Sequence, residues 1–265
     1  IIFGGLNHDF DTESYDKPHM RLPYGQTTLI QEVAKANPNT VVVIIAGSPV
    51  ELAGIVNRVP SILWAWYGGM EAGNAIVDVL SGKVNPSGKM PFTLPVLLEQ
   101  SPAHALGNYP GRNLKVNYEE DILVGYRWFD TKNITPQFPF GYGLSYTTFN
   151  LDNLSTDKKV YGKDDIIYIK FTVTNTGSRY GAEVAQIYVS DPVCSVLRPA
   201  KELKAFEKVF LQPGESKNIE LPIKVSDLAF YDEAKKEWVV EPGEFILQLG
   251  NSSRNISKTV TITFQ

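Results

Sequence analysis

The sequence has very little cysteine. Cys194 is the single cysteine among 265 residues, so the chain can form neither an internal disulfide nor a metal cluster held by several thiolates. The histidines His8, His19 and His104 do not have the spacing of a metal-binding motif, and the chain has no phosphate-binding G-x-x-x-x-G-K-[ST] motif. The sequence therefore predicts no bound metal and no cofactor.

An excess of one charge and long apolar runs are also missing. The 25 Lys and Arg against 29 Asp and Glu give a net charge of −4, which offers no basic surface to nucleic acid or to an anionic membrane. No apolar run reaches the roughly 18 residues that a membrane span requires. Hydrophobic residues make up 43% of the chain, which is typical of a globular protein with a substantial core. We therefore expect a globular protein without nucleic-acid partners or a membrane span.

The start of the sequence lacks both an initiator methionine and a signal peptide. It lies within an apolar run, "IIFGGLN", which predicts a strand whose edges need partners. We therefore expect these residues to be the C-terminal part of a longer polypeptide, or one chain of a split protein.

Residues 1–95 alternate short apolar runs with helical patterns. The runs at 1–7, 40–49 and 61–69 predict strands that are buried on both faces. Helical patterns are present at 25–38, 49–59 and 70–82, and Ser48 and Pro49 are interpreted as the N-cap and first residue of the second helix. This order predicts an α/β sandwich domain with a mostly parallel sheet. Ligands bind such sheets beyond the carboxyl ends of the strands.

Residues 146–265 have a different pattern of apolar and polar residues. Short segments of period-two alternation are separated by turn signals such as Gln212–Gly214 and Glu241–Gly243. The pattern predicts an all-β sandwich like an immunoglobulin or fibronectin type III domain. Residues 96–145, rich in Pro, Gly and aromatic residues, are predicted to be an irregular connector between the two domains.

Four acids follow the first predicted strand, in the stretch "GLNHDFDTESYDK": Asp9, Asp11, Glu13 and Asp16. A helix–loop–helix calcium site is excluded, because Ser14 and Met20 stand where it needs Gly and a bidentate acid. One carboxyl in this loop could act as a general acid and base, with its neutral form favoured by aromatic and acidic neighbours. Alternatively, the acids are solvated loop residues or caps.

Five motifs occur in a characteristic order: "GLNHDFDTESYDK", "VVVIIAGSPVEL", "ILWAWYGGMEAGNAIVDVLSGKVNPSGKMPFTLP", "YEEDILVGYRWFD" and "FPFGYGLSYTTF". Together they resemble the C-terminal region of the family three glycoside hydrolases, the β-glucosidase family. The resemblance implies that an N-terminal (β/α)₈ barrel precedes an α/β sandwich domain and a fibronectin type III-like domain.

The resemblance implies a retaining, exo-acting β-glycosidase, and β-glucosidase is the most frequent activity. It assigns the general acid/base to Glu13, because "ESYDK" matches a pattern like E-G-Y-D-R, with Ser14 and Lys17 in place of Gly and Arg. Asp16 is interpreted as a residue that supports the catalyst or caps a helix. The roles of Asp9 and Asp11 stay open: they raise the pKa of the catalyst, touch sugar hydroxyls, or shape the loop.

The family's nucleophilic Asp belongs to the barrel, so this chain alone is expected to be inactive. "SDL" at 226–228 shares only letters with the nucleophile's context. The expected partners are the barrel and a β-linked oligosaccharide or glucoside.

Trp64, Trp66 and Tyr67 are interpreted as buried strand residues rather than a sugar platform. A β-xylosidase, another β-hexosidase and a non-catalytic sugar-binding or scaffold module remain alternatives. A periplasmic or secreted location is weakly favoured by the resemblance.

Overall fold

The computed structural model describes residues 1–265, and these divide into two units. The first unit comprises residues 1–84, 94–119 and 135–138, and the second comprises residues 85–93, 120–134 and 139–265. None of the helices has the length and hydrophobicity that crossing a bilayer requires.

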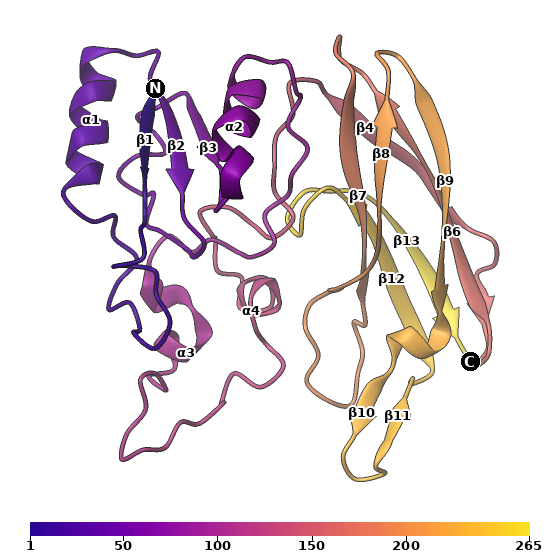
Figure 1. Ribbon diagram of the computed structural model, residues 1–265. Helices are drawn as coiled ribbons and strands as arrows, with labels where there is room; N and C mark the ends of the chain where they lie inside the picture. Colours follow the sequence, from indigo (N-terminus) through magenta and orange to yellow (C-terminus); the bar gives the residue numbers. More distant parts are fainter. The chain divides into compact units, whose positions relative to one another are not determined.

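The first unit contains a three-stranded parallel sheet in the order β1-β2-β3 (Figure 1). Its elements are β1 (Ile2–Gly5), α1 (Gln26–Ala36), β2 (Val41–Ile45), β3 (Ser61–Trp64), η1 (Gly69–Glu71), α2 (Ala72–Leu80), η2 (Leu98–Gln100) and α3 (Pro102–Ala105). The Gln26 side chain fixes α1 to β1, because it accepts a hydrogen bond from Gly5 N (2.7 Å) and donates one to Gly5 O (3.0 Å). The parallel α/β prediction is therefore confirmed.

Burial differs among the three strands. Val42, Val43 and Ile44 of the central strand β2 are completely buried, as predicted for a strand covered on both faces. In β1, by contrast, Phe3 is 57% exposed. The prediction of full burial is thus wrong for β1, and also for β3, in which no residue is buried; both are edge strands with a neighbouring strand on one side only. The helix at 70–82 forms as α2, and Gly82 follows it with a φ of 76°.

The helix predicted at 49–59 does not form. Residues 53–58 make turns instead, in which the N–H groups of Ile55 and Val56 both bond to Leu52 O (2.8 and 2.9 Å). Gly54 and Pro60 account for the short span, since both disfavour continuation of a helix. The interpretation of Ser48 as a helix N-cap is wrong as well, because no helix follows it and its hydroxyl donates a hydrogen bond to Asp11 instead.

The second unit is a β-sandwich, as predicted. Its elements are α4 (Tyr126–Thr131), β4 (Phe149–Thr156), β5 (Val160–Tyr161), β6 (Ile166–Asn175), β7 (Gly181–Ser190), β8 (Glu202–Leu211), β9 (Ser216–Lys224), η3 (Val225–Leu228), β10 (Phe230–Asp232), β11 (Glu237–Val239), β12 (Gly243–Gly250) and β13 (Ile256–Phe264). A five-stranded sheet in the order β5-β13-β12-β7-β8 and a three-stranded sheet in the order β4-β6-β9 form the sandwich, and β10 and β11 form a separate hairpin (Figure 1).

Alternating side chains build the core of the sandwich. In β6 the residues Ile167, Ile169, Phe171 and Val173 are buried, whereas the residues between them face outward. They meet buried residues of the other sheet in one cluster, among them Ile187, Phe245, Leu247 and Ile262. The burial of alternate residues, predicted from the period-two pattern of the sequence, is therefore confirmed for β6.

Part of the region predicted to be an irregular connector belongs to the second unit. In α4, the Tyr126 ring stacks on Phe140 at 4.8 Å, and its hydroxyl accepts a hydrogen bond from Leu203 N (2.8 Å). Trp128 and Phe129 of the same helix are buried in a small cluster with Leu123. This cluster makes residues 120–134 compact, and the contacts of Tyr126 with Phe140 and Leu203 link the segment to the rest of the second unit.

Candidate active site

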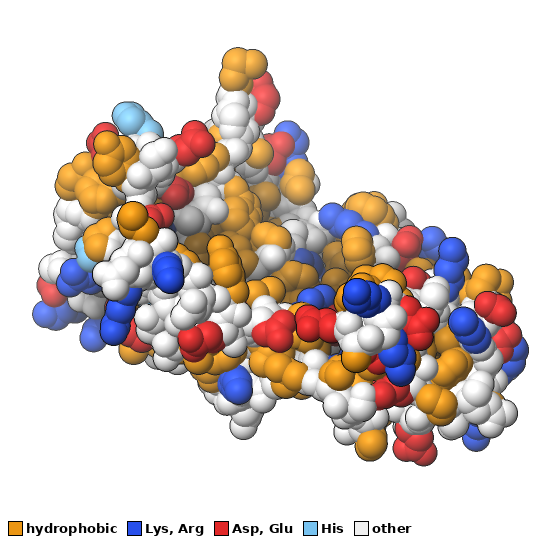
Figure 2. Space-filling model, turned by 90° about the horizontal axis from the view of Figure 1, so that it is seen from below, with side chains coloured by type: hydrophobic (Ala, Val, Ile, Leu, Met, Phe, Trp, Pro, Cys, Tyr) orange, Lys and Arg blue, Asp and Glu red, His pale blue; other side chains and the backbone are white.

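The acidic loop, residues 7–17, begins directly beyond β1. Leu6 N bonds to Ile45 O at 2.8 Å, so the loop departs beside the end of β2. Because the three strands are parallel, the segments after β2 and β3 start at the same edge of the sheet. Figure 1 shows the arrow of β2 pointing down toward this edge, and Figure 2 views the molecule from that side. The loop therefore occupies the position at which an open α/β sheet binds ligands.

Asp11 is the central anchor of the acidic loop. Its carboxylate accepts hydrogen bonds from Ser48 Oγ (2.8 Å), Tyr67 OH (2.9 Å) and Gly47 N (3.2 Å). Gly47 and Ser48 follow β2, and Tyr67 follows β3. One carboxylate thus joins the loop after β1 to the ends of the other two strands. Of the possibilities that the sequence left open for Asp11, this geometry supports the shaping of the loop.

Lys17 reinforces this anchor from the far end of the loop. Its Nζ donates to Ser48 Oγ and to Pro49 O (3.3 Å). Burial lowers the pKa of Lys17, although the charge of Asp11 opposes that effect. Burial also acts to raise the pKa of Asp11, but the hydrogen bonds from Ser48, Tyr67 and Gly47 and the charge of Lys17 outweigh it and lower this pKa. The loop is therefore braced by an ionised carboxylate.

Tyr67 and Gly47, which both bond to Asp11, lie in a different setting from the buried strand that the sequence predicts. Tyr67 is 51% exposed and its hydroxyl bonds Asp11, so the interpretation of Tyr67 as a buried strand residue is wrong. The strand ends earlier, at Trp64, and Trp66 has a φ of 56°. A Cβ at Gly47 would lie 2.7 Å from the Tyr67 ring and 3.2 Å from Asp11 Oδ2, so the packing around Asp11 requires a glycine there.

Asp16 fixes the other side of the loop. The Tyr109 hydroxyl donates a hydrogen bond to the Asp16 carboxylate, and this bond raises the pKa of Tyr109. Tyr109 in turn packs against the His104 ring at 5.1 Å, and His104 Nδ1 lies 2.9 Å from Ser101 Oγ. No helix begins at Asp16, so its interpretation as a helix cap is wrong. Its contact supports the other possibility, that of a residue which positions the loop.

Glu13 lies between these two anchors. It is exposed, and it makes no hydrogen bond or ion pair within the chain, whereas Asp11 and Asp16 are both engaged. Asp9 is engaged locally, since it accepts from Asn7 Nδ2 (3.2 Å) and its own N–H bonds Asn7 Oδ1 (3.1 Å). The structure thus leaves Glu13 as the one acid of the loop whose carboxyl is free to meet a ligand.

Ser14 supplies a prediction about the loop. Its φ is 68°, in the left-handed region where an L residue is disfavoured and glycine is not. We expect Ser14→Gly to increase the free energy of unfolding by about 0.5–1 kcal/mol, measured by urea denaturation. Thr12→Gly is the matched control, because Thr12 does not have positive φ and glycine there should be destabilising. A loss of stability in both variants would contradict the prediction.

The remaining candidate ligands are dispersed. The His8 side chain is 93% exposed beside Asp9, while His104 supports Tyr109. No group of three or more His, Cys, Asp or Glu residues has the geometry to hold a metal ion. Asp227, in the "SDL" stretch, accepts a hydrogen bond from Lys224 N (3.0 Å) at the start of η3. That contact gives it a structural role in the sandwich.

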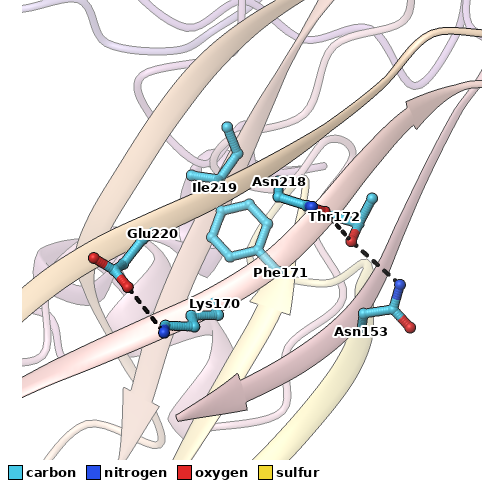
Figure 3. A pocket seen from close by; sticks show the side chains of 7 residues that line it. All are labelled: Asn153, Lys170, Phe171, Thr172, Asn218, Ile219 and Glu220. Carbon is cyan, nitrogen blue, oxygen red and sulfur yellow. Dashed lines mark hydrogen bonds and ion pairs between the residues drawn. The ribbon is translucent and has the colours of Figure 1, made fainter. Parts of the chain in front are cut away.

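A shallow hollow of about 480 Å³ lies on the outer face of the sheet β4-β6-β9 and not in the unit of the acidic loop (Figure 3). Asn153 Nδ2 donates to Thr172 Oγ1 (3.2 Å), which donates to Asn218 Oδ1 (2.9 Å), and Lys170 pairs with Glu220 at 3.2 Å. Because these side chains pair with one another, the hollow presents few free groups to a ligand. The edge beyond β1–β3, where the acidic loop lies, is the better candidate.

The chain is similar to known proteins over its whole length. The family described as "Glycosyl hydrolase family 3 C-terminal domain" matches residues 1–146, and the "Fibronectin type III-like domain" matches residues 183–253. The chain is 47% identical to Beta-glucosidase BoGH3A of Bacteroides ovatus over 100% of this chain and 36% of that protein. It is 46% identical to Thermostable beta-glucosidase B of Acetivibrio thermocellus over 97% of this chain and 34% of that protein.

Solved structures show the same similarity. The family 3 β-glucosidase of Bifidobacterium adolescentis aligns with a TM-score of 0.94 and 38% identity, covering 99% of this chain and 38% of that one. A β-glucosidase from Kluyveromyces marxianus in complex with glucose aligns with a TM-score of 0.93 and 42% identity, covering 99% of this chain and 31% of that one. The resemblance and the fold class predicted from the sequence are confirmed. The chain spans about a third of the length of these relatives.

Proposed function

Because the chain belongs to glycosyl hydrolase family 3, we propose that it forms the C-terminal portion of a retaining, exo-acting β-glucosidase in which Glu13 is the general acid and base. The observation that supports the proposal is the difference in bonding among the acids of the acidic loop. Asp11 and Asp16 fasten it on both sides of Glu13, and the Glu13 carboxyl alone has no partner in the chain.

The partner in this proposal is an N-terminal (β/α)₈ barrel that contributes the nucleophilic Asp. Retaining hydrolysis needs two carboxyl groups about 5–5.5 Å apart. Within the loop, Asp11 is occupied by three donors and Asp16 by the Tyr109 hydroxyl, so neither is available as the second carboxyl. A carboxylate from outside this chain fills that need.

In the proposed mechanism, protonated Glu13 donates its proton to the glycosidic oxygen while the barrel Asp attacks the anomeric carbon. The leaving group departs and a glycosyl-enzyme forms. Glu13, now ionised, then accepts a proton from water, and that water attacks the anomeric carbon and releases the sugar with its β configuration. The exposed position of Glu13 suits this exchange, because the proton must pass to the leaving group and later come from water.

A glucoside substrate is supported by the relatives. Those described above are named β-glucosidases, and one solved neighbour holds glucose. We expect the full-length protein to hydrolyse an aryl β-glucoside faster than the matching β-xyloside. Proton NMR of the reaction should show β-glucose appearing first, before mutarotation. Initial release of α-glucose would contradict a retaining mechanism, and faster turnover of the xyloside would reassign the sugar.

A further inference from the structure

The outward face of strand β8 carries an exposed row of aromatic side chains. β8 is an edge strand of the five-stranded sheet and lies beside β7 (Figure 1). Its inward residues Val209 and Leu211 are buried in the core of the sandwich. On the opposite face, Phe206 and Phe210 are 63% and 56% exposed, and Tyr180, which precedes β7, is 51% exposed. We call Phe206, Phe210 and Tyr180 the aromatic strip.

The aromatic strip has two nearly parallel rings at one end. The ring centroids of Tyr180 and Phe210 are 6.5 Å apart, and the ring planes differ by only 21°. The backbone pairing of Gly181 with Leu211 brings together these two rings, which belong to the preceding residues. Phe206 lies on the same face as Phe210, four residues earlier, which is about 13 Å along the strand. The strip is therefore elongated, as a site for a chain-like ligand has to be.

The backbone at Tyr180 is held by Asn85, which belongs to the same unit. Asn85 Nδ2 donates to Tyr180 O (2.9 Å), and Asn85 Oδ1 accepts hydrogen bonds from Tyr146 N (2.8 Å) and Ser145 Oγ (2.9 Å). A Cβ on Gly181 would lie 2.6 Å from Asn85 Nδ2, so this contact requires a glycine beside Tyr180. A ring on a fixed backbone loses little freedom when a ligand binds. This end of the strip is thus a preformed surface.

The size of the aromatic strip argues against a second protein chain as its occupant. Because an aromatic side chain has roughly 150–250 Å² of surface and each ring is more than half exposed, the strip presents about 350 Å² of apolar area. A stable protein interface needs about 800 Å² from each partner. Lys208 also lies between Phe206 and Phe210 on the same face, and lysine is depleted in protein interfaces. The strip therefore suits a smaller ligand.

The chemistry of the aromatic strip matches the two kinds of group on a β-linked glucose unit. The faces of the sugar ring carry C–H groups, which are attracted to the negative face of an aromatic ring. The hydroxyls lie around the rim of the sugar ring and accept hydrogen bonds. Lys208 Nζ, 5.5 Å from the centroid of the Phe210 ring, places such a donor beside the stacking surface.

We propose that the aromatic strip binds the chain of a β-glucan, with sugar faces on the rings of Tyr180, Phe210 and Phe206. The inference rests on the proposed function, which makes β-linked glucose the sugar that this protein meets. Binding at the strip holds a polymeric substrate on the enzyme and raises its local concentration, and it takes no part in proton transfer. A short aryl glucoside does not need this contact.

A second exposed aromatic pair in the same unit supplies the matched control. Tyr231 and Trp238, in the hairpin of β10 and β11, have ring centroids 5.6 Å apart, but their planes differ by 68°. The edge of one ring therefore points toward the face of the other, and the pair presents no flat surface to successive sugar units. Trp238 is 72% exposed, so its replacement removes as much exposed aromatic surface as a change within the strip.

Affinity electrophoresis of the full-length protein tests the binding. Native gels contain hydroxyethylcellulose, a soluble mixed-linkage β-glucan or, as the α-linked control, dextran, and Glu13→Ala is the parent so that glucan is not consumed. We expect at least one β-glucan to retard the parent. Phe210→Ala and Phe210→Leu should weaken that binding by about fivefold or more, whereas Phe210→Tyr, which keeps a ring, should stay within about twofold. Trp238→Ala should bind like the parent.

Several outcomes would overturn the proposal. These are equal retardation of the parent and of Phe210→Ala, retardation by dextran alone, and a changed oligomeric state of Phe210→Ala with unchanged retardation. In the protein that retains Glu13, Phe210→Ala should keep kcat/KM for an aryl β-glucoside within about twofold, which shows that the variant is folded. If the full-length protein hydrolyses no β-glucoside, the proposed function fails, and the retardation still decides whether the strip binds β-glucan.

Discussion

In the full-length protein, replacing Glu13 with alanine should reduce kcat/KM for an aryl β-glucoside with a poor leaving group by about 10²–10⁴-fold. A poor leaving group needs a proton in the first step, and Glu13→Ala removes its donor. A very good leaving group departs without a proton, so its first step should be slowed far less. Steady-state kinetics with two aryl glucosides of different leaving-group pKa measure this difference.

Asp9→Asn is the matched control for this result. Asp9 carries the same charge in the same loop, is exposed, and contacts only neighbouring groups of the loop. We expect kcat/KM to stay within about twofold of wild type, because such a surface substitution has small effects. An equal loss in Asp9→Asn and Glu13→Ala would show that the loop needs its total charge and that Glu13 has no special task.

The second large effect is expected for Asp11→Ala. This change removes the acceptor of three hydrogen bonds that join the loop to the ends of β2 and β3, and leaves half-buried Lys17 without its counter-charge. A displacement of about 1 Å at a catalytic group can cost 10²-fold in rate. If Asp11 positions Glu13 and does not bind the sugar, as we propose, kcat should fall by about 10–100-fold with a smaller change in KM.

A variant that removes one of the hydrogen-bond donors to Asp11 distinguishes the positioning of Glu13 from its proton transfer. Tyr67→Phe deletes one of the three donors to Asp11 and keeps the ring that packs against Gly47. Its kcat should lie between that of wild type and that of Asp11→Ala. The leaving-group dependence should stay like that of wild type, because Glu13 still supplies the proton. If Tyr67→Phe instead shows the leaving-group pattern of Glu13→Ala, the division of roles between Asp11 and Glu13 is wrong.

The lowered pKa of Asp11 also sets a pH dependence. A carboxyl whose pKa is lower in the folded protein stabilises the fold fully above its ordinary value of 3.8, and this contribution is lost as the pH falls through the folded pKa. Ser48→Ala removes a donor that lowers the pKa of Asp11. As the pH is lowered, Asp11 should therefore become protonated, and its contribution to the stability of the loop should be lost, at a higher pH than in wild type. Acid titration followed by the fluorescence of the nearby Trp64 and Trp66 measures the shift, and an unmoved transition would contradict it.

The two-part architecture could be predicted because the apolar residues of each half follow a simple pattern along the strands. Central strand β2 is an unbroken apolar run, and β6 alternates strictly between core and solvent. Strand β4 was not predicted, because its register shifts between Asp152 and Ser155, where Asn153 has a φ of 56°, and the shift breaks the alternation. The segment 49–59 has helical periodicity, but Gly54 and Pro60 limit it to turns.

Glu13 is a candidate catalyst because a short motif resembles the family's pattern, whereas the residues that support its loop could not be predicted. Ser48 and Tyr67 lie 37 and 56 residues from Asp11, and no short-range pattern connects them. A signal did exist: both residues lie near the C-terminal ends of the strands predicted at 40–49 and 61–69, and the carboxyl ends of parallel strands meet at one edge. Tyr109 follows no predicted strand, so its bond to Asp16 becomes visible only in the folded chain.

The most direct test of the central claim is the product that Glu13→Ala forms in the presence of azide. With an activated aryl β-glucoside, the variant should accumulate its glycosyl-enzyme, because no general base activates water. Azide needs no such base, so we expect it to restore turnover and to yield β-glucosyl azide, identified by NMR. Turnover that azide leaves unchanged, with glucose as the only product, would contradict the assignment of Glu13 as the acid and base.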